Sequence, residues 1–396
     1  MASPKVLYVS YDGALEPLGR SQIVPYLLGL ASRGALITLL SFEKRADWGS
    51  AQRGRALRTE LASQGIRWTA LRYHKRPRLL ATAADLLVGL ASVVRIAKRE
   101  KIQFIHARSY VAAFIAWMAK RILGLPFVFD MRGFWADERL EAGLISAGGL
   151  VYRFAKRAEL HILRDADEVI TLTERARQTV NDWLRDRGPS VTVIPTCVDL
   201  SRFSPAAGSR LVDSAPVFVY AGSLGTWYAL EEMLRFVEEA ARRYPRARFL
   251  LLTPNLRSAD RELARVGPGC RSVALVSASP AEVARWLRSA DAGLAFYRTG
   301  FSRQGTCPTK IGEYLATGLP VVVNEAVGDM KEIVGTNRVG TVLADFSGQA
   351  YALALDELEK LWADPALAAR CRSVAESYFS LQAGVDRYWA VYRRLA

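Results

Sequence analysis

Hydrophobic and polar residues follow two patterns, which alternate along this chain. Short runs rich in valine, isoleucine, leucine and phenylalanine are separated by longer segments in which apolar residues recur at helical spacing. This alternation is typical of repeated strand–helix units that build a parallel sheet. It predicts strands at residues 5–11, 35–42, 66–73, 104–109, 126–133, 168–173, 191–196, 215–222, 248–253, 272–277, 292–297, 319–324 and 340–345.

The length and one irregular segment predict two domains. The chain has 396 residues, whereas single cores stop growing at roughly 250–300 residues. Residues 200–216 show little periodicity and are dense in serine, proline, alanine and glycine, which is typical of a linker. We therefore expect an N-terminal domain over 1–199, a linker over 200–216 and a C-terminal domain over 217–378. An amphipathic helix over 379–396 could fold back across the linker to the N-terminal domain.

The predicted fold class is α/β, with two Rossmann-like, doubly wound parallel-sheet domains. Open sheets of this type bind ligands beyond the carboxyl ends of their strands, so we expect a site in a cleft between the domains. Residues 279–282 (SPAE) also predict a capped helix start, because Ser279 and Glu282 can form a capping box and Pro280 suits the first turn.

Composition narrows the classes of function. The formal net charge is +15, and residues 1–200 hold 30 basic and 19 acidic side chains against 24 and 20 in the remainder. Such an excess attracts anions: nucleotides, nucleic acid or an acidic membrane surface. The four cysteines form no CxxC pair and there are three histidines, so a zinc ribbon, a disulfide framework and a histidine-rich metal site are disfavoured. The cysteine pattern favours a reducing compartment.

Neither a signal peptide nor a membrane span is expected. The N-terminus MASPKVLYVSYDG runs directly into a strand, and apolar runs such as residues 110–119 fall short of the roughly 18–20 residues that span a bilayer. Residues 73–101 bracket an apolar helix with basic clusters, which is compatible with a helix on an anionic bilayer or with a core helix whose ends are solvated. We expect a cytoplasmic protein whose membrane contact, if any, is peripheral, at the inner face of the cell membrane.

The segment GTCPTKIGEYLATGLPVVVN, residues 305–324, carries the strongest candidate chemistry. Pro308 and Thr309 suit a helix start, and Gly318 suits its end about two turns later. The helix N-terminus is an anion site to which Lys310 adds a charge. Glu313, one turn on, is placed to accept hydrogen bonds from a ribose. The alternative is a lysine–glutamate surface pair on an ordinary helix.

Two glycine-containing loops follow strands. Gly222 and Ser223 follow a strand and precede a helix, where a ligand can approach the backbone, although tight strand–helix packing explains the glycine equally well. Near the N-terminus, Gly13, Gly19 and Ser21 follow the first strand, where the loop either presents amides to a substrate or is a plain turn.

Charged residues also follow strands in the first half. Asp130 and Arg132 lie just past a buried strand, and His106 and Arg108 end the preceding one. Charges gathered at a carboxyl edge indicate a site, although a lone histidine there is more often structural. The sequence DAD at 165–167 imitates a metal-binding motif of some sugar transferases, but it precedes its strand, and we interpret it as a loop or helix terminus.

The chain resembles the retaining glycosyltransferases of family 4, which have the GT-B fold. The resemblance rests on PLGRSQIVPYLLGLA, DADEVITLTE, VTVIPTCVDLSRF, VYAGSLGTWY and PTKIGEYLATGLPVVVNEAVGD and covers nearly the whole length. It implies an acceptor-binding first domain, a donor-binding second domain, and transfer of a sugar from a nucleotide-diphosphate sugar with retention and without a metal or other cofactor. By carry-over, Glu313 holds the donor ribose, the amides of Thr309 and Lys310 hold the diphosphate, and Gly222 backs the phosphates.

On the acceptor side, the resemblance places Gly19 and Ser21 in the cleft, with His106 and Arg108 as further cleft candidates. Arg132 falls where the family often has a histidine of the catalytic region, so Arg132 and Asp130 are candidate catalytic residues.

Three departures from the family pattern concern the donor site. Gly305 stands where the first of two glutamates is expected, and Ser223 and Tyr228 stand where an arginine and a lysine usually follow the glycine loop. A departing nucleoside diphosphate gains charge that must be stabilised by donors already in place. We infer that Lys310, which is also a catalytic candidate, replaces the missing cations together with Arg298 and Arg303.

The leading interpretation is a glycosyltransferase that acts on a glycan or a lipid-linked acceptor, for example in envelope polysaccharide assembly. A nucleotide-sugar epimerase of the same fold and a non-catalytic nucleotide-sugar or polyanion-binding protein are the alternatives. Nucleic acid is disfavoured as a partner, because the basic residues are scattered and no interleaved aromatic platform accompanies them.

Overall fold

The computed structural model describes residues 3–48, 51–74, 76–205, 215–225, 227–254, 256–266 and 273–396. The chain folds into two units. The first comprises Met1–Pro195 and Leu381–Ala396, and the second comprises Thr196–Ser380. The chain therefore passes between the units twice, once in each direction.

The first unit contains a seven-stranded parallel sheet in the order β3-β2-β1-β4-β5-β6-β7. All seven strands predicted in this half are present, most of them shorter than expected. Their bounds are β1 Lys5–Ser10, β2 Leu36–Glu43, β3 Arg67–Arg72, β4 Phe104–Arg108, β5 Phe127–Asp130, β6 Glu168–Thr171 and β7 Ser190–Val193.

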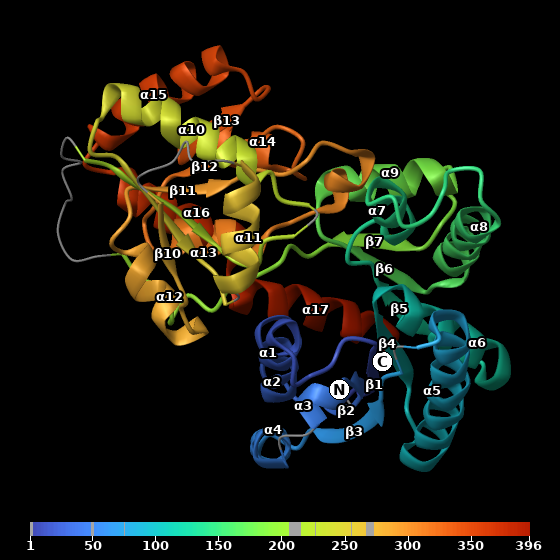
Figure 1. The fold of residues 1–396 in the computed structure, drawn as a ribbon. Coiled ribbons are helices and arrows are strands. Elements are labelled where there is room, and N and C mark those ends of the chain that lie inside the picture. The colour runs from blue at the N-terminus through green and yellow to red at the C-terminus, as the bar shows by residue number, and fades with distance from the viewer. Residues whose placement is uncertain are drawn as a thin grey trace. The chain divides into compact units, whose positions relative to one another are not determined.

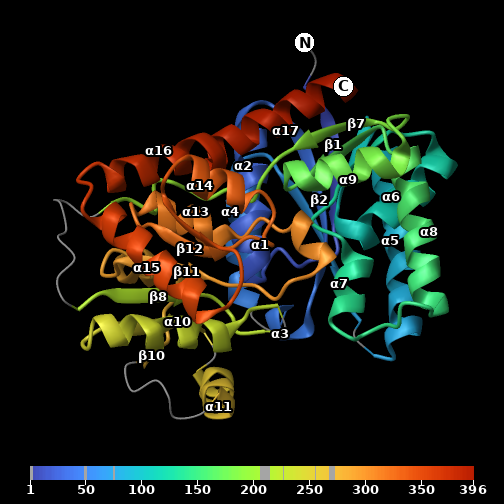
Figure 2. The ribbon, with the colours of Figure 1, turned by 90° about the horizontal axis from the view of Figure 1, so that it is seen from above.

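Helices cover both faces of this sheet (Figures 1 and 2). The last helix of the chain, α17, is part of this unit and packs against α2. The helices are α1 Pro17–Gln22, α2 Val24–Ser32, α3 Arg45–Trp48, α4 Ala51–Ser63, α5 Arg78–Glu100, α6 Ser109–Leu123, α7 Trp135–Glu141, α8 Leu150–Asp165, α9 Glu174–Leu184 and α17 Leu381–Leu395.

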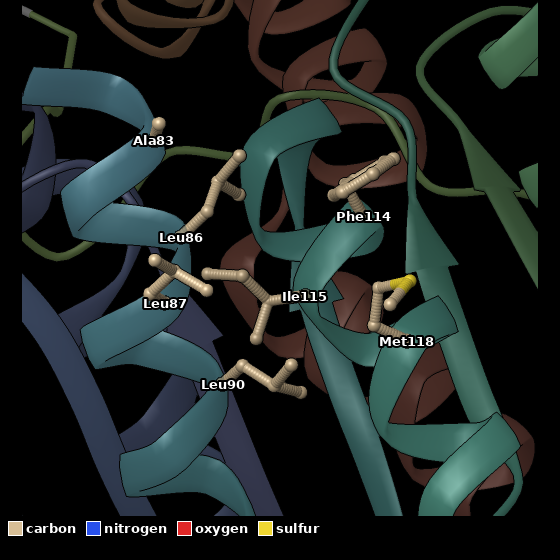
Figure 3. A pocket seen from close by; sticks show the side chains of 7 residues that line it. All are labelled: Ala83, Leu86, Leu87, Leu90, Phe114, Ile115 and Met118. Carbon is tan, nitrogen blue, oxygen red and sulfur yellow. The ribbon is translucent and has the colours of Figure 1, made fainter. Parts of the chain in front are cut away.

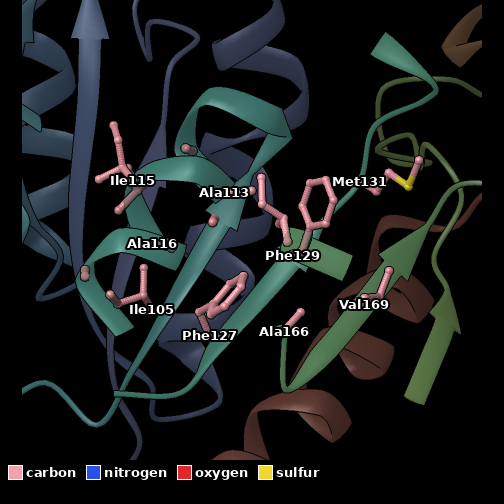
Figure 4. Close-up of a cluster of buried hydrophobic side chains, with 14 of the residues drawn as sticks. Ile105, Ala113, Ile115, Ala116, Phe127, Phe129, Met131, Ala166 and Val169 are labelled. Atoms are coloured by element: carbon pink, nitrogen blue, oxygen red, sulfur yellow. The ribbon is translucent and has the colours of Figure 1, made fainter. Parts of the chain in front are cut away.

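A hydrophobic core lies between the first sheet and the helices α5, α6, α8 and α9 (Figure 4). Side chains alternate between the two faces of a strand. In β4, Ile105 and Ala107 enter this core, whereas His106 and Arg108 point to the opposite face; in β5, Phe127 and Phe129 enter it. The pleat therefore separates an apolar face from a face that carries the candidate polar residues.

Helix α5 corrects one expectation. From Leu80 to Glu100 it is long and apolar enough to cross a membrane by length and composition alone, although we expected no such segment, and 39% of its most apolar window is buried within the protein. Its inner side is nevertheless anchored in the first unit: Val93 and Ile96 belong to the core, and buried Asp85 accepts a hydrogen bond from Tyr11 at 2.8 Å. The helix is thus an integral part of a folded domain.

The second unit contains a six-stranded parallel sheet in the order β10-β9-β8-β11-β12-β13. The six strands predicted here are also confirmed. They are β8 Val217–Ala221, β9 Arg248–Leu252, β10 Val273–Val276, β11 Ala292–Ala295, β12 Val321–Asn324 and β13 Gly340–Leu343. The helices are α10 Leu230–Arg243, α11 Leu256–Val266, α12 Pro280–Leu287, the 3-10 helix η1 Phe301–Gly305, α13 Thr309–Ala316, α14 Met330–Thr336, α15 Gly348–Trp362 and α16 Leu367–Phe379.

The capping box predicted at Ser279 and Glu282 is present at the start of α12. Glu282 accepts a hydrogen bond from the Ser279 backbone amide at 2.9 Å. Local sequence is enough to predict this feature because both partners lie within one turn.

The chain leaves the first unit after Pro195 and returns to it after Ser380. Residues 196–205, which overlap the expected linker over 200–216, fold as part of the second unit: Val198 donates a backbone hydrogen bond to Phe379 at 2.8 Å, and Arg372 donates to the carbonyls of Leu200 and Phe203. Residues 206–214 lie outside the described ranges. The units are joined at Pro195 and at Ser380, where short extended segments leave one core and enter the other.

Each sheet has one point at which strand order reverses along the chain. In the first sheet it lies between β1 and β4, and in the second between β8 and β11. In open α/β sheets the loops diverge at such a point on the carboxyl edge, and ligands bind there. Gly222 follows β8, Tyr297 follows β11 closely, and the two segments lie next to each other within the second unit.

Candidate active site

Helix α13 has the bounds that the sequence predicted. It begins at Thr309, directly after Pro308, and ends at Ala316, before Gly318 takes a left-handed conformation with φ of 76°. Its inner side packs on the sheet, where the Tyr314 hydroxyl accepts a hydrogen bond from the Ala221 amide at 2.8 Å. This bond fixes the start of α13 beside the carboxyl end of β8.

The side chain of Lys310 is buried in a cage of tyrosines. Its Nζ lies 4.0 Å from the ring centroid of Tyr220, 3.9 Å from that of Tyr228 and 5.8 Å from that of Tyr297. Within the described part of the chain, this Nζ is buried without a hydrogen-bond partner. The surface-pair alternative for Lys310 is therefore disfavoured, because an exposed lysine would keep its ammonium in water.

Burial also changes the chemistry of this amine. It lowers the pKa of Lys310 well below its ordinary value, and the nearby charge of Glu313 offsets the shift only in part. The faces of the tyrosine rings favour the ammonium by a cation–π interaction of roughly 0.5–2 kcal/mol.

Gly222 lies directly against that amine. Its φ is 143°, a region that residues with a side chain rarely adopt, and a Cβ built on it would come 3.2 Å from Lys310 Nζ. Its own amide donates to the Leu252 carbonyl at 2.9 Å. The glycine therefore keeps the space beside the amine open at the strand-to-helix turn.

The backbone that carries the cage is held by pairing across the switch point. Tyr228 and Tyr297 form an isolated antiparallel bridge, and the Arg298 amide donates to the Trp227 carbonyl at 3.0 Å. Asn324, at the end of β12, bonds both the amide and the carbonyl of Tyr297, at 2.9 and 3.0 Å. These bonds hold Tyr228 and Tyr297, which are far apart in the sequence, beside one lysine.

The remaining donor-side candidates take different positions. The Arg303 guanidinium is buried, lies 4.5 Å from the centroid of the Trp227 ring and donates to Ser302 Oγ at 2.7 Å. Arg298 and Ser223 are exposed, and the Ser223 carbonyl accepts a hydrogen bond from Tyr220 at 2.8 Å. Arg303 and Lys310 thus border the turn at residues 227–228 with their side chains, whereas Arg298 holds that turn through its backbone.

Glu313 lies one turn after Lys310 and is half-buried, and Thr309 is half-buried at the start of the helix. Burial raises the pKa of Glu313, while the charges of Lys310 and Arg202 oppose the shift. The first amides of an α-helix have no acceptor within the helix. The start of α13 therefore combines free donors, a buried amine and a carboxyl group within one turn of each other.

In the first unit, strand register brings four predicted residues into one buried network. Tyr8 pairs with His106, and Arg108 pairs with Asp130, on the sheet face opposite the core described above. Asp130 is fully buried and lies 3.4 Å from Arg132, 3.7 Å from Arg108 and 3.4 Å from His106. Burial by itself would raise the pKa of Asp130, but Arg132, His106 and Arg108 outweigh it and hold the pKa below its usual range.

Asp130 is therefore ionised and out of reach of solvent, so it can position Arg132 but cannot itself touch a substrate in this conformation. Arg132 is the member of the network that reaches the surface, with 11% of its side chain exposed. The two residues therefore have different roles: Asp130 is a buried carboxylate that positions Arg132, and Arg132 is a partly exposed cation.

Sequence reasoning predicted the C-terminal helix but missed the two tyrosines by which it completes this network. Tyr388 in α17 donates its hydroxyl hydrogen to Asp130 at 3.0 Å, and the Tyr392 hydroxyl lies 2.8 Å from Nδ1 of His106. Two tyrosines four residues apart on an amphipathic helix share a face, which is the signal that could have indicated them.

The hydrogen bonds also assign the tautomer of His106. Burial lowers the pKa of His106 in spite of Asp130, so the ring is neutral near pH 7. Because the ionised Asp130 can only accept, Nε2 of the ring carries the hydrogen, and Nδ1 accepts from Tyr392. His106 thus links β4 to α17 through the Tyr392 hydroxyl.

The N-terminal loop does not present free amides, which was one of the two alternatives for it. The amides of Ala14 and Leu15 donate to the buried carboxylate of Glu43 at 2.8 and 3.2 Å, and the amide of Gly13 donates to Glu16 at 3.2 Å. Gly19 lies in α1, where a Cβ would come 2.1 Å from the Gly13 carbonyl oxygen.

Ser21, in the same short helix, is exposed and bonds back to the Pro17 carbonyl at 2.9 Å. The glycine there serves close packing within the first unit, and the chain forms a helix where we expected a loop.

The DAD sequence lies at a helix terminus, as interpreted: α8 ends at Asp165. Asp165 accepts hydrogen bonds from Trp117 and Arg121 at 2.6 and 2.9 Å, and Asp167 accepts from Lys120 at 2.7 Å and from the Phe127 amide at 2.8 Å. Both carboxylates thus tie α8 and β6 to neighbouring elements.

Two open parallel sheets, each with a polar cluster at or near its carboxyl edge, define a two-domain α/β protein with a buried lysine at the switch point of its second sheet. Sequence models of known families agree with this class. Residues 23–197 match the glycosyl transferase 4-like domain, and residues 215–360 match the glycosyl transferases group 1 domain. Because the two models together cover most of the chain, it belongs to the glycosyltransferases with the family 4-like GT-B fold.

Solved structures share the whole architecture. The sucrose-phosphate synthase of Thermosynechococcus elongatus matches with a TM-score of 0.70 and 16% identity over 99% of each chain. A glycosyltransferase from Rickettsia africae matches with 0.70 and 13%, over 100% of this chain and 99% of that chain. HepE from Anabaena, solved with UDP and glucose, matches with 0.68 and 16%, over 99% and 100%. No protein of curated function matches the chain in sequence.

Proposed function

We propose that this glycosyltransferase transfers a sugar from a nucleotide-diphosphate sugar to an acceptor hydroxyl with retention of configuration and without a metal ion. The observation that carries the proposal is the buried Lys310 amine, which has no hydrogen-bond partner among the described residues and lies beside Gly222 at the start of α13. A diphosphate is the ligand that suits an amine, free helix amides and an open glycine turn at one point.

The tyrosine cage also supports a replacement of the missing cations. Tyr228 stands where the family usually has a lysine, and its ring lies 3.9 Å from Lys310 Nζ. The positive charge is therefore supplied from α13 to the place that the loop leaves without one. Arg303, stacked on Trp227 beside the same turn, is the second candidate for phosphate contact.

The chemical roles follow from charge development. As the bond between the anomeric carbon and the phosphate oxygen breaks, negative charge grows on the leaving diphosphate. Preorganised donors whose hydrogen bonds to the diphosphate strengthen in the transition state lower the barrier. Lys310 and the amides of Thr309 and Lys310 take that role, Glu313 accepts hydrogen bonds from the ribose, and Arg132, positioned by Asp130, acts on the acceptor side.

Support for a nucleotide donor also comes from the relatives: HepE was solved with UDP-glucose, and the Escherichia coli trehalose-6-phosphate enzyme with UDP-2-fluoroglucose. We propose a glycan or a lipid-linked carrier as the acceptor, in envelope polysaccharide assembly, on the cytoplasmic side of the membrane. The three cysteines in the described ranges are buried and form no disulfide there, which is typical of a reducing compartment.

The test is a thermal-shift and calorimetric titration with UDP, GDP and their sugars, followed by turnover with and without candidate acceptors. We expect Lys310→Ala to lower kcat by about tenfold or more, because a charged contact with the leaving group is lost. Lys360→Ala, at an exposed lysine of the same domain, is the matched control. An unchanged kcat in Lys310→Ala removes Lys310 from the mechanism, and donor turnover that needs no acceptor indicates an epimerase.

A further inference from the structure

The outer face of α5 is apolar where a surface helix is normally polar. The exposed positions of α5 recur at helical spacing, and Leu80, Leu87 and Val88 are 71%, 70% and 49% exposed. Between and after them stand exposed alanines at positions 83, 84 and 91. The first half of this outward stripe thus holds only apolar side chains, and nothing in the first unit among the described residues covers it.

A pocket of about 280 Å³ continues this apolar surface between α5 and α6. Its lining is entirely apolar, and Figure 3 shows the side chains of the two helices facing each other across it. Leu86, Leu87 and Leu90 come from α5, and Phe114 and Met118 come from α6. The two helices therefore share an apolar surface with a depression along their junction.

Helices α6 and α8 extend the same surface. Helix α6 packs against both α5 and α8 on one face of the sheet (Figure 2). On α8, Leu150 is 81% exposed and Phe154 is 68% exposed, and Ile122 at the end of α6 is also exposed. Scattered exposed leucines are ordinary, but several on neighbouring helices mark an interaction surface.

Basic side chains flank the exposed apolar residues of these helices. Each helix starts near the carboxyl edge of the parallel sheet and runs back to its amino edge, because it connects parallel strands. On α5 the exposed apolar residues lie between exposed Arg76, just before the helix, and exposed Arg95, Lys98 and Arg99 at its end. On α8, exposed Arg153 stands between Leu150 and Phe154, and exposed basic residues follow at 157 and 164. The apolar surface is thus bordered by basic side chains toward both edges of the sheet.

We propose that the outer faces of α5, α6 and α8, the α5–α6–α8 face, dock on an anionic lipid bilayer. Apolar side chains of these helices enter the boundary between headgroups and acyl chains, and the flanking basic side chains remain among anionic headgroups. Charge complementarity favours this occupant, since the basic ends have no counterpart on a second, equally basic copy of the chain. The helix lies on the bilayer and does not cross it, because its inner side is packed into the core by Val93 and Ile96.

Docking in this way has a consequence for the acceptor side of the first unit. The apolar part of the face borders the carboxyl edge, which is also the edge where Arg132 follows β5. An acceptor hydroxyl carried by a membrane lipid would therefore be presented at the edge that holds this cation. The docking itself does not depend on the donor chemistry proposed above.

The test is sedimentation of the full chain with vesicles of phosphatidylcholine alone and of phosphatidylcholine mixed with phosphatidylglycerol, at low and high salt. We expect binding to the mixed vesicles that weakens with salt. The double variant Leu87→Ser/Val88→Ser should lower the partition coefficient by about tenfold or more, because two apolar side chains no longer enter the lipid. Arg95→Gln/Lys98→Gln should lower it by about fivefold for each charge removed at low salt.

Leu353→Ser is the matched control, since Leu353 is 61% exposed on α15 in the other unit. It should bind vesicles as the wild type does. A nucleoside-diphosphate titration of each variant reports the donor domain separately, so that a failure of docking and a failure of the proposed function are distinguishable. The proposal is overturned if the wild type binds neutral and mixed vesicles equally, or if Leu87→Ser/Val88→Ser binds as the wild type does. It is also overturned if the wild type is a dimer that this variant converts to monomer.

Discussion

We expect the buried amine of Lys310 to lower the stability of the protein without a ligand and to contribute to catalysis when the donor is bound. Replacement by methionine keeps the length of the side chain and removes the polar group, and a thioether packs favourably against aromatic rings. A buried polar group without a partner costs about 1–3 kcal/mol. Cation–π contacts with Tyr220 and Tyr228, whose ring centroids lie 4.0 and 3.9 Å from the amine, offset roughly 0.5–2 kcal/mol of this cost.

We therefore expect Lys310→Met to stabilise the second domain by about 1 kcal/mol near pH 7, which corresponds to about 2–4 °C in Tm for a domain of this size. The same variant should lose most of its transferase activity, because the diphosphate loses its charged contact. Lys360→Met, at an exposed lysine of α15, is the control and should change neither property.

The stability difference between Lys310→Met and the wild type should depend on pH, which a change in packing alone would not produce. The folded-state pKa of Lys310 is lowered from its ordinary value of 10.5. Between those two pKa values the unfolded chain binds a proton that the folded chain does not, so the stability of the wild type rises with pH through this window. Lys310→Met lacks the group. Its advantage should be largest below the folded-state pKa and should shrink as the pH approaches 10.5.

Differential scanning calorimetry from pH 6 to 10 measures these differences, since the two domains can unfold in separate transitions. A loss of about 2 kcal/mol or more in Lys310→Met would refute the reasoning, because the amine would then make a stabilising contact in the free protein. A stability difference that does not change with pH would show that the amine is not desolvated.

Two further predictions concern neighbouring features. Gly222→Ala should lower the stability of the second domain by about 1–3 kcal/mol and weaken nucleotide binding, because alanine is strained at a φ of 143° and its Cβ presses on Lys310. Gly225→Ala, in the same loop, should stay within about 0.5 kcal/mol in calorimetry, because a Cβ there meets no described heavy atom within 4 Å. Tyr388→Phe should destabilise the first domain by about 1–3 kcal/mol in urea unfolding, because the buried Asp130 carboxylate loses a donor at 3.0 Å.

Tyr378→Phe is the control for the last prediction, because Tyr378 is 40% exposed on α16. Equal stability of the two tyrosine variants would mean that α17 does not hold Asp130 through its hydroxyl. Equal effects of the two alanine variants would mean that the loop beside Lys310 tolerates a side chain.

The sequence by itself determined where the strands and helices lie along the chain. The alternation of apolar runs predicted all thirteen strands, and proline and glycine predicted both ends of α13, because strand pleat, helix period and caps depend on residues a few positions apart. The motif at 305–324 likewise indicated Lys310 and Glu313, which are three residues apart on one helix.

Only the tertiary structure decided what surrounds those residues. Tyr220, Tyr228 and Tyr297 lie on segments that meet where strand order reverses, and Tyr388 reaches Asp130 from 258 residues away. The hydropathy of α5 was compatible with a core helix and with a lipid-facing one, and its packing on one side alone decided which face is bare. Sequence patterns report which face of an element is apolar, whereas burial depends on the neighbours that the fold supplies.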